Sequence, residues 1–155
     1  MTIVLNGTGE ILKKINPERR IAFAVNTEGK NKFGFTDKIA EEYWPEIVNI
    51  GPTELGKVLT KKVDDVEFYA LCCYSLINGW KNQKEVIKKC FDSIPGNAPV
   101  ATIAIGTGLV GFLTGADFGQ IRQGMEESDK QIILYSWCIT EAKSILNRML
   151  FVKLD

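Results

Sequence analysis

Three glycines follow an apolar, largely β-branched run in the second half of the chain. The run is Val100–Ile105, and Gly106, Gly108 and Gly111 come next in the segment GTGLVG. Glycines after a buried strand let backbone N–H groups approach phosphate oxygens, and a following helix N-terminus adds partial positive charge. The G-x-G-x-x-G order by itself fits a structural turn as well as a phosphate site, so the rest of the chain has to decide between them.

A second glycine-containing loop follows a second apolar run. Arg20–Asn26 (RIAFAVN) is nearly continuous in apolar residues, and residues 27–35 (TEGKNKFGF) carry two glycines. Open α/β sheets bind ligands just beyond the carboxyl ends of their strands. We therefore expect the two loops to border one ligand cleft.

The side chains available for catalysis are few. The chain has no histidine, which removes the commonest general base and every Ser-His or Cys-His pair. Asn26, Glu28, Lys30 and Asp37 could hold or orient a water molecule, but none has the spacing of a paired acid and base.

Composition predicts one globular domain, residues 1–155. Hydrophobic residues make up 45% and charged residues 25%, and 19 basic residues balance 19 acidic ones. This neutrality argues against a long nucleic-acid partner. The sequence shows no export signal and no apolar run of about 18 residues, so we expect a cytoplasmic protein that does not enter membranes.

The four cysteines are expected to be free thiols. They lack C-x-x-C spacing and lie mostly in apolar surroundings, which favours free buried thiols over disulfides or a metal site. We expect neither a metal nor a cofactor. The four are Cys72, Cys73, Cys90 and Cys138.

Hydrophobic periodicity predicts alternating strands and helices. This order indicates a three-layer α/β/α sandwich around a mixed, mostly buried central sheet. The expected strands are Thr2–Leu5, Arg20–Asn26, 56–63, 67–76, Val100–Ile105 and 131–137. The expected helices run from Thr36, as N-cap, to a stop at Pro45, from Asn82 to Ile94, over 115–127, and from Thr140, as N-cap, to Phe151.

The arrangement as a whole resembles the macro domain, the ADP-ribose-binding module. The resemblance spans Thr2–Trp137 and rests on GEIL (Gly9–Leu12), AFAVN, EGKNKFGFTDKIA, IGTGLVGF and ILYSW, in that order. The stretch EFYALCCYSL, with a helix after it, looks most like the branch of terminal ADP-ribose glycohydrolases and ADP-ribose-1″-phosphate phosphatases.

The resemblance implies roles for matching positions. Asn26 would face the distal ribose, or would cap a strand end, and Tyr135 would pack near the adenine, or would be a plain core residue. The glycine loop would wrap the pyrophosphate, with Glu10 and Ile11 beside the adenine. The implied ligand-binding set is Glu10, Ile11, Asn26, Gly29, Gly106, Thr107, Gly108, Leu109, Val110, Gly111, Phe112 and Tyr135.

The function implied is binding of ADP-ribose or a related nucleotide or ADP-ribosyl group. One alternative is hydrolysis of ADP-ribose-1″-phosphate or ADP-ribosyl esters, with Asn26 as the candidate catalytic residue. Another is a protein that kept the fold and lost the pocket. The glycohydrolase branch uses a lysine and an aspartate where this chain has about Tyr74 and Val110, so the resemblance favours binding over hydrolysis.

Overall fold

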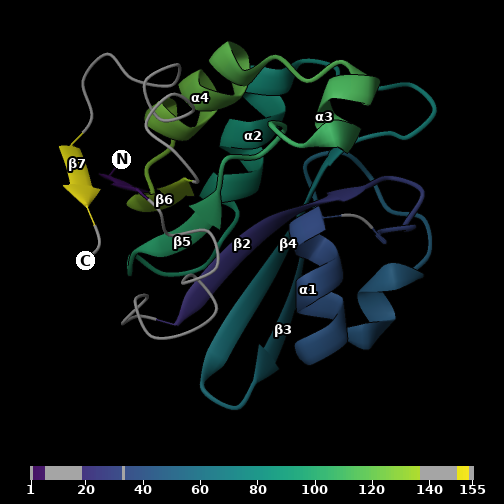
Figure 1. Ribbon diagram of the computed structural model, residues 1–155, viewed down its shortest axis with the longest axis horizontal. Coiled ribbons are helices and arrows are strands. Elements are labelled where there is room, and N and C mark those ends of the chain that lie inside the picture. Colours follow the sequence, from purple (N-terminus) through teal and green to yellow (C-terminus); the bar gives the residue numbers. More distant parts are fainter. Residues whose placement is uncertain (1, 6–18, 33, 137–149, 154–155) are drawn as a thin grey trace.

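A mixed sheet forms the centre of the fold (Figure 1). The computed structural model describes residues 2–5, 19–32, 34–136 and 150–153. Within these residues the sheet has seven strands in the order β3-β4-β2-β5-β6-β1-β7, with every pair parallel except β3 and β4. The strands are β1 (Thr2–Leu5), β2 (Arg20–Asn26), β3 (Val58–Val63), β4 (Val66–Tyr74), β5 (Val100–Ile103), β6 (Ile132–Ser136) and β7 (Leu150–Lys153).

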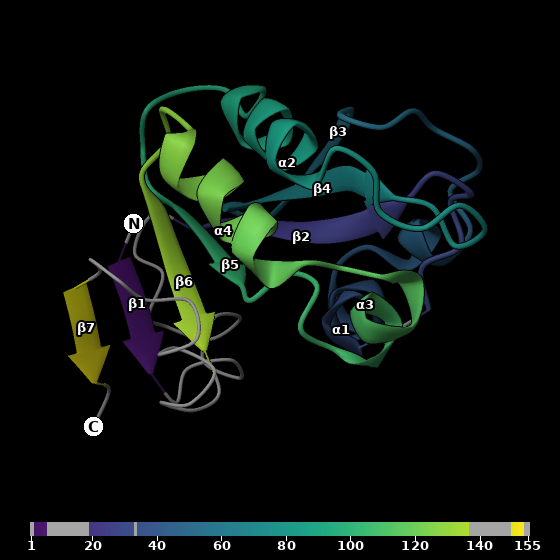
Figure 2. The ribbon, with the colours of Figure 1, turned by 90° about the horizontal axis from the view of Figure 1, so that it is seen from above.

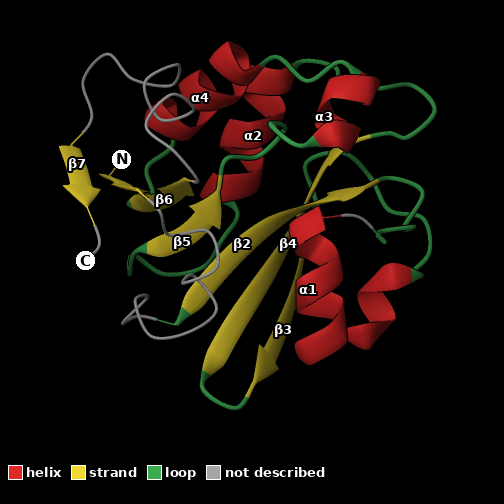
Figure 3. Cartoon of the chain, in the orientation of Figure 1, coloured by secondary structure: helices red, strands yellow, loops and turns green. Residues whose placement is uncertain are grey.

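Helices cover both faces of the sheet, as the sequence predicts. Figure 2 shows α2 (Gln83–Asp92) and α4 (Phe118–Glu127) on one side and α1 (Gly34–Glu42) on the other. The 3₁₀ helix η2 (Pro45–Val48) follows α1, and the short helix α3 (Leu109–Thr114) follows β5 (Figure 3). The three-layer α/β/α sandwich is therefore confirmed. No helix of the described ranges is long and apolar enough to cross a bilayer.

The central strands are apolar throughout because both of their faces are covered. In β2, Ile21, Phe23 and Val25 join the core beneath α1 and η2, whereas Ala22 joins the core beneath α2 and α4. Successive side chains of a strand point to opposite faces. A strand between two helical layers therefore loses the polar alternation of a half-exposed strand.

The structure corrects the predicted start of the first helix. α1 begins at Gly34, so the expectation of Thr36 as the N-cap is wrong. Thr36 lies within the first turn, where its hydroxyl donates to the carbonyl oxygen of Ala24 at 3.0 Å. The side chain ties the helix to β2 instead of capping it. The predicted stop is confirmed, because the helix ends at Glu42, before Pro45.

The glycine-rich loop also differs from the expectation. Its second half is α3, which begins after the N-cap Gly108 and ends at Gly115, a left-handed residue with φ of 87°. Gly115 therefore ends one helix, and the expected start of the next helix at that residue is wrong. α4 begins later, after Asp117, whose carboxylate accepts from the Gln120 N–H.

The last predicted helix is wrong where it can be compared with the structure. Leu150 and Phe151 lie in β7, which pairs with β1 in parallel, starting from Thr2 opposite Leu150. The strand supplies partners for backbone groups along that edge of β1, and unpaired backbone groups are costly. The remainder of the expected helix, residues 140–149, lies outside the described residues.

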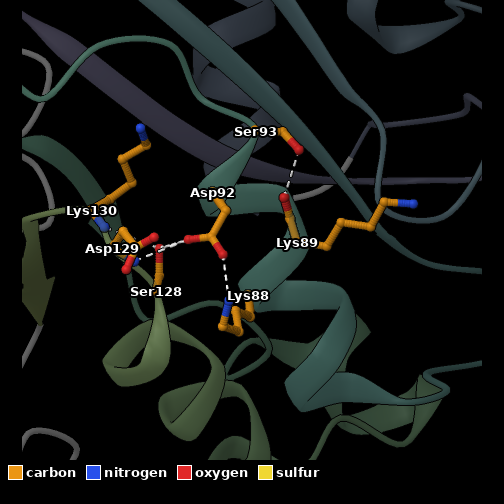
Figure 4. A network of polar contacts seen from close by, with 7 residues as sticks. All are labelled: Lys88, Lys89, Asp92, Ser93, Ser128, Asp129 and Lys130. Atoms are coloured by element: carbon orange, nitrogen blue, oxygen red, sulfur yellow. Dashed lines mark hydrogen bonds and ion pairs between the residues drawn. The ribbon is translucent and has the colours of Figure 1, made fainter.

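A polar network joins the carboxyl ends of α2 and α4 (Figure 4). The Asp92 carboxylate accepts from Lys88 Nζ at 2.6 Å, from Ser128 Oγ at 2.7 Å and from the Asp129 N–H at 3.0 Å. Partial burial of Asp92 raises its pKa, but the three donors outweigh that effect and hold the pKa below its ordinary value of 3.8. Asp92 is therefore more stable as a carboxylate in the folded protein than in the unfolded chain.

We expect Asp92→Asn to lower the melting temperature by about 2–4 °C at pH 7, the shift that about 1 kcal/mol produces in a domain of this size. A lowered folded pKa contributes stability above the unfolded value and loses it as pH falls through the folded value. The difference between wild type and variant should therefore shrink below about pH 4. Thermal melts from pH 7 to pH 3 measure it, with Asp129→Asn as the control. A difference that is constant with pH would contradict the assignment.

Candidate functional site

A cleft of about 590 Å³ lies at the carboxyl ends of β2, β4 and β5, between the start of α1 and the loop that joins β5 to α3. Its size is within the usual range for small-molecule sites. The two loops that the sequence singles out therefore contribute to one cavity. The described residues that line it are Phe23, Ala24, Lys32, Gly34, Phe35, Thr36, Lys38, Tyr74, Trp80, Ile103, Ala104, Ile105, Gly106, Thr107, Gly108, Leu109, Val110 and Gly111.

The three glycines of GTGLVG lie in different structural environments. Gly106 has φ of +83°, and a Cβ there would lie 2.7 Å from Ile121 Cδ1. A Cβ on Gly111 would lie 2.2 Å from the Gly106 carbonyl oxygen. Gly108 has φ of −81°, and a Cβ there would meet no atom within 4 Å. Gly106 and Gly111 are thus required by packing, whereas Gly108 borders open space in the cleft.

The start of α3 lines the same cavity and has backbone donors without intrahelical acceptors. The Phe112 N–H donates to the Gly108 carbonyl oxygen at 3.0 Å and closes the first turn. The N–H groups of Leu109, Val110 and Gly111 come earlier in the helix, where no intrahelical acceptor exists. All three residues line the cleft.

The segment after β4 and the start of α2 hold α3 in place. Trp80 Nε1 donates to Thr114 Oγ1 at 2.8 Å. Gln83, the first residue of α2, donates to the Gly115 carbonyl oxygen at 3.2 Å and accepts from the Asp117 N–H at 2.6 Å. These contacts fix both the end of α3 and the turn beyond it.

Two stacked aromatic rings form one wall of the cleft. The Tyr74 and Trp80 ring centroids are 4.8 Å apart, and the ring planes differ by 7°. Burial raises the pKa of Tyr74 and outweighs the opposing effect of a hydrogen bond with the Asn26 side chain. Tyr74 therefore keeps its proton at neutral pH and is not a general base.

The charges of the described cleft lining are positive. Lys32 and Lys38 belong to it, and none of the described lining residues is an aspartate or glutamate. Opposite charges attract more strongly in a partly desolvated cavity than in water. The lining is thus suited to an anion, and its described part offers no carboxylate pair for acid–base chemistry.

Asn26 lies at the end of β2 but outside the cleft lining. It is fully buried, its Nδ2 donates to the Lys30 carbonyl oxygen at 2.7 Å, and its Oδ1 accepts from the Lys30 N–H at 3.0 Å. Gly29, inside this turn, packs against Gly51 and is also outside the lining. The amide of Asn26 therefore closes the turn after the strand.

The other candidates from the sequence are dispersed. Tyr135 is 1% exposed in the core, and burial raises its pKa to about 12. Phe112 is 79% exposed and is not a lining residue. Glu10 and Ile11 lie outside the described residues. The cleft contains the remaining six predicted positions, 106–111.

Glu28 is held by hydrogen bonds within the protein. Its carboxylate accepts from Ser75 Oγ at 2.6 Å, from the Leu76 N–H at 2.7 Å and from Thr27 Oγ1 at 3.0 Å. Slight burial raises its pKa, and these hydrogen bonds together lower it below the ordinary value. Glu28 thus holds the segment after β4 against the loop after β2.

Sequence reasoning missed the aromatic wall and the two lysines. The resemblance points to Tyr74 only as a replacement for a lysine, and Trp80 has no local signal because its partner Thr114 is 34 residues away. Lys32 and Lys38 could have been found, since both flank the predicted start of the helix after a glycine-containing loop.

Comparisons with solved structures agree with this architecture. An alphavirus P23pro-zbd structure matches with a TM-score of 0.62 and 14% identity over 93% of this chain, which spans 23% of the alphavirus chain. A mutant macrodomain of Oceanobacillus iheyensis with ADPR matches with a TM-score of 0.61 and 16% identity, over 92% of this chain and 87% of the other. The Trypanosoma brucei macrodomain in complex with ADP gives 0.58 and 16%, over 92% and 66%.

These likenesses show a macro-domain fold. The identities are too low to carry more than the fold. Neither the protein-family models nor the curated proteins give a match to the chain.

Proposed function

We propose that this chain binds ADP-ribose, or a related nucleotide or ADP-ribosyl group that contains it, in the cleft between α1 and α3. Two macrodomains with the same fold are described with ADPR or with ADP. The observation that carries the proposal is the composition of the cleft wall. Leu109, Val110 and Gly111 at the start of α3 line the same cavity as Lys32 and Lys38, and the described lining contains no carboxylate.

The cleft has a matching surface for each part of a nucleoside diphosphate. The phosphates suit the glycine loop and the lysines, because charge-assisted hydrogen bonds are the stronger kind. The apolar lining residues, among them Phe23, Phe35 and Ile103, suit a planar ring or a sugar face.

Hydrolysis of ADP-ribose-1″-phosphate or ADP-ribosyl esters has less support. By the resemblance, the lysine and aspartate of the hydrolase branch would fall at about Tyr74 and Val110, and both of these residues line the cleft. Neither is suited to transfer a proton near neutral pH, since the Tyr74 pKa is raised by burial and valine has no ionisable group. A positioned acid or base typically contributes about 10²–10⁴-fold to a rate.

We expect ADP-ribose to bind about tenfold or more tightly than AMP. AMP lacks the second phosphate, and a hydrogen bond to a charged group contributes about 1.5–3 kcal/mol, which corresponds to roughly 10–150-fold in affinity. Titration calorimetry with both ligands at one salt concentration measures the difference.

Two outcomes would contradict the proposal in different ways. Equal affinity for the two ligands would mean that the loop at Gly108 does not hold a second phosphate. The absence of binding by either would favour a protein that kept the fold and lost nucleotide binding.

A further inference from the structure

We propose that the Tyr74 hydroxyl donates a hydrogen bond to the terminal sugar of the bound nucleotide, and that this contact makes the cleft prefer ADP-ribose to ADP. The inference rests on the proposed function and assigns the recognition of the sugar to one side chain. Its basis is the position of Tyr74 at the end of β4, where the residue lines the cleft and is 7% exposed.

An extra residue at the end of β4 turns Tyr74 to the other face of the sheet. Where β2 and β4 pair, Cys72 lies opposite Val25. The next pair is Tyr74 with Asn26, so Cys73 is an extra residue in β4. Strict alternation would place Tyr74 with Cys72 in the core beneath α1. Instead Tyr74 joins Cys73 in the core beneath α2 and α4, since a bulge of this kind re-aims the side chains beside it.

The aromatic wall fixes the Tyr74 ring. The ring stacks on Trp80, with centroids 4.8 Å apart and planes that differ by 7°. Trp80 is held in turn, because its indole N–H donates to Thr114 Oγ1 at 2.8 Å. A ring held in this way keeps its hydroxyl in one place, so a hydrogen bond to a ligand costs little side-chain entropy.

The Tyr74 hydroxyl has its oxygen engaged and its proton able to donate. The hydrogen bond with the Asn26 side chain lowers the pKa of Tyr74, so Asn26 donates it and the phenol oxygen accepts. The Asn26 amide nitrogen can do this because it has two protons and gives the other to the Lys30 carbonyl oxygen at 2.7 Å. The O–H of Tyr74 is thus available to an acceptor in the cleft.

The apolar surfaces of the cleft belong to different faces of the sheet. Phe23, Phe35 and Ile103 belong to the core beneath α1 or pack against it. Tyr74 and Trp80 belong to the core beneath α2 and α4 or pack against it. The first surface has no polar side-chain atom and suits the base. The second combines ring faces with a hydroxyl and suits a sugar, which has apolar C–H faces and hydroxyl groups.

The Tyr74 hydroxyl is matched to an uncharged oxygen. Phosphates have cationic partners in Lys32 and Lys38, whose charge-assisted hydrogen bonds are stronger than those of a neutral phenol. Burial raises the pKa of Tyr74 and keeps the phenol neutral. A site that hydrogen-bonds a ligand hydroxyl discriminates against a ligand that lacks it, because a buried polar group is then left unpaired.

The first test compares ADP-ribose with ADP on the wild-type protein by titration calorimetry. We expect ADP-ribose to bind about three to ten times more tightly, the factor that one neutral hydrogen bond gives. Equal dissociation constants would overturn the inference and leave the proposed function standing. If neither ligand binds, both are overturned.

Tyr74→Phe is the second test, because it keeps the stacked ring and removes only the hydroxyl. We expect the affinity for ADP-ribose to fall by about three- to tenfold and that for ADP to change by less than about twofold. In a protein shown by circular dichroism to be folded, an equal loss for both ligands, or no loss for either, would overturn the inference. If the variant fails to fold, the wild-type comparison still decides.

Tyr43→Phe is the matched control. The Tyr43 ring also packs on an aromatic ring, that of Phe68 at 4.9 Å between centroids, and Tyr43 is not a lining residue of the cleft. The variant therefore removes a tyrosine hydroxyl outside the site, and the preference for ADP-ribose should remain. Loss of the preference in Tyr43→Phe as well would overturn the assignment to Tyr74.

Discussion

Gly108→Glu is expected to reduce affinity for ADP-ribose by about a hundredfold or more in a protein that stays folded. Gly108 borders open space in the cleft, and its φ of −81° is accessible to any residue. A glutamate there fills the volume next to the first N–H groups of α3, and its carboxylate repels the phosphates. Loss of two charge-assisted contacts at about 1.5 kcal/mol each already corresponds to about 150-fold.

Gly108→Ala is the matched control. Its Cβ meets no atom within 4 Å, so the methyl group neither clashes nor carries charge. We expect it to change affinity by less than about fivefold. Calorimetry gives both affinities, and circular dichroism melts show whether each variant is folded. A correctly folded Gly108→Glu protein with wild-type affinity would place the ligand elsewhere on the molecule.

The strands of the sheet other than β7 could be predicted because each has a local pattern of apolar residues. Both faces of β2 and β4 are covered, and this is visible in the sequence as continuous apolar runs. The β3–β4 hairpin follows from an alternating run and an apolar run that are separated by Asp64 and Asp65. Asp64 adopts the left-handed conformation that aspartate tolerates at a turn.

The misplaced element boundaries depend on tertiary contacts. Thr36 has the side chain of an N-cap, yet its hydroxyl reaches a carbonyl of β2, twelve residues away in sequence. The segment Leu109–Thr114 contains Val110, Gly111 and Thr114, and these residue types disfavour a helix in isolation. The helix forms where Trp80 and Gln83 hold its end.

In the candidate site, too, the residues with a local sequence pattern could be predicted, and those placed by tertiary contacts could not. The glycine loop could be located because glycines after a buried strand have a local meaning. The environment of the Asn26 side chain could not be predicted in this way. Its amide pairs with backbone atoms of Lys30, and the conformation of that turn decides whether an amide at a strand end points into a cavity. The aromatic wall depends on the packing of α3 against Trp80, which sequence spacing does not show.

Gly29→Ala is expected to have the largest effect on stability, because the turn that holds Asn26 packs on the backbone of a second glycine. Gly29 has φ of +71°, and a Cβ there would lie 1.9 Å from the Gly51 carbonyl oxygen. The Ile50 N–H also donates to the Gly29 carbonyl oxygen at 2.9 Å, so the two segments cannot separate without losing that bond. The variant combines a left-handed alanine with a backbone clash, and we expect a loss of about 3–5 kcal/mol.

Gly51→Ala separates the clash from the backbone strain. Gly51 has φ of +90°, but a Cβ there would meet no atom within 4 Å, so only the left-handed cost of about 1–2 kcal/mol applies. At about 2–4 °C per kcal/mol, the melting temperature should fall by roughly 2–8 °C for Gly51→Ala and by roughly 6–20 °C for Gly29→Ala. Thermal and urea unfolding of both variants measure the difference. Equal losses would show that the two segments move apart freely, and that contact between Gly29 and Gly51 does not hold the Asn26 turn in place.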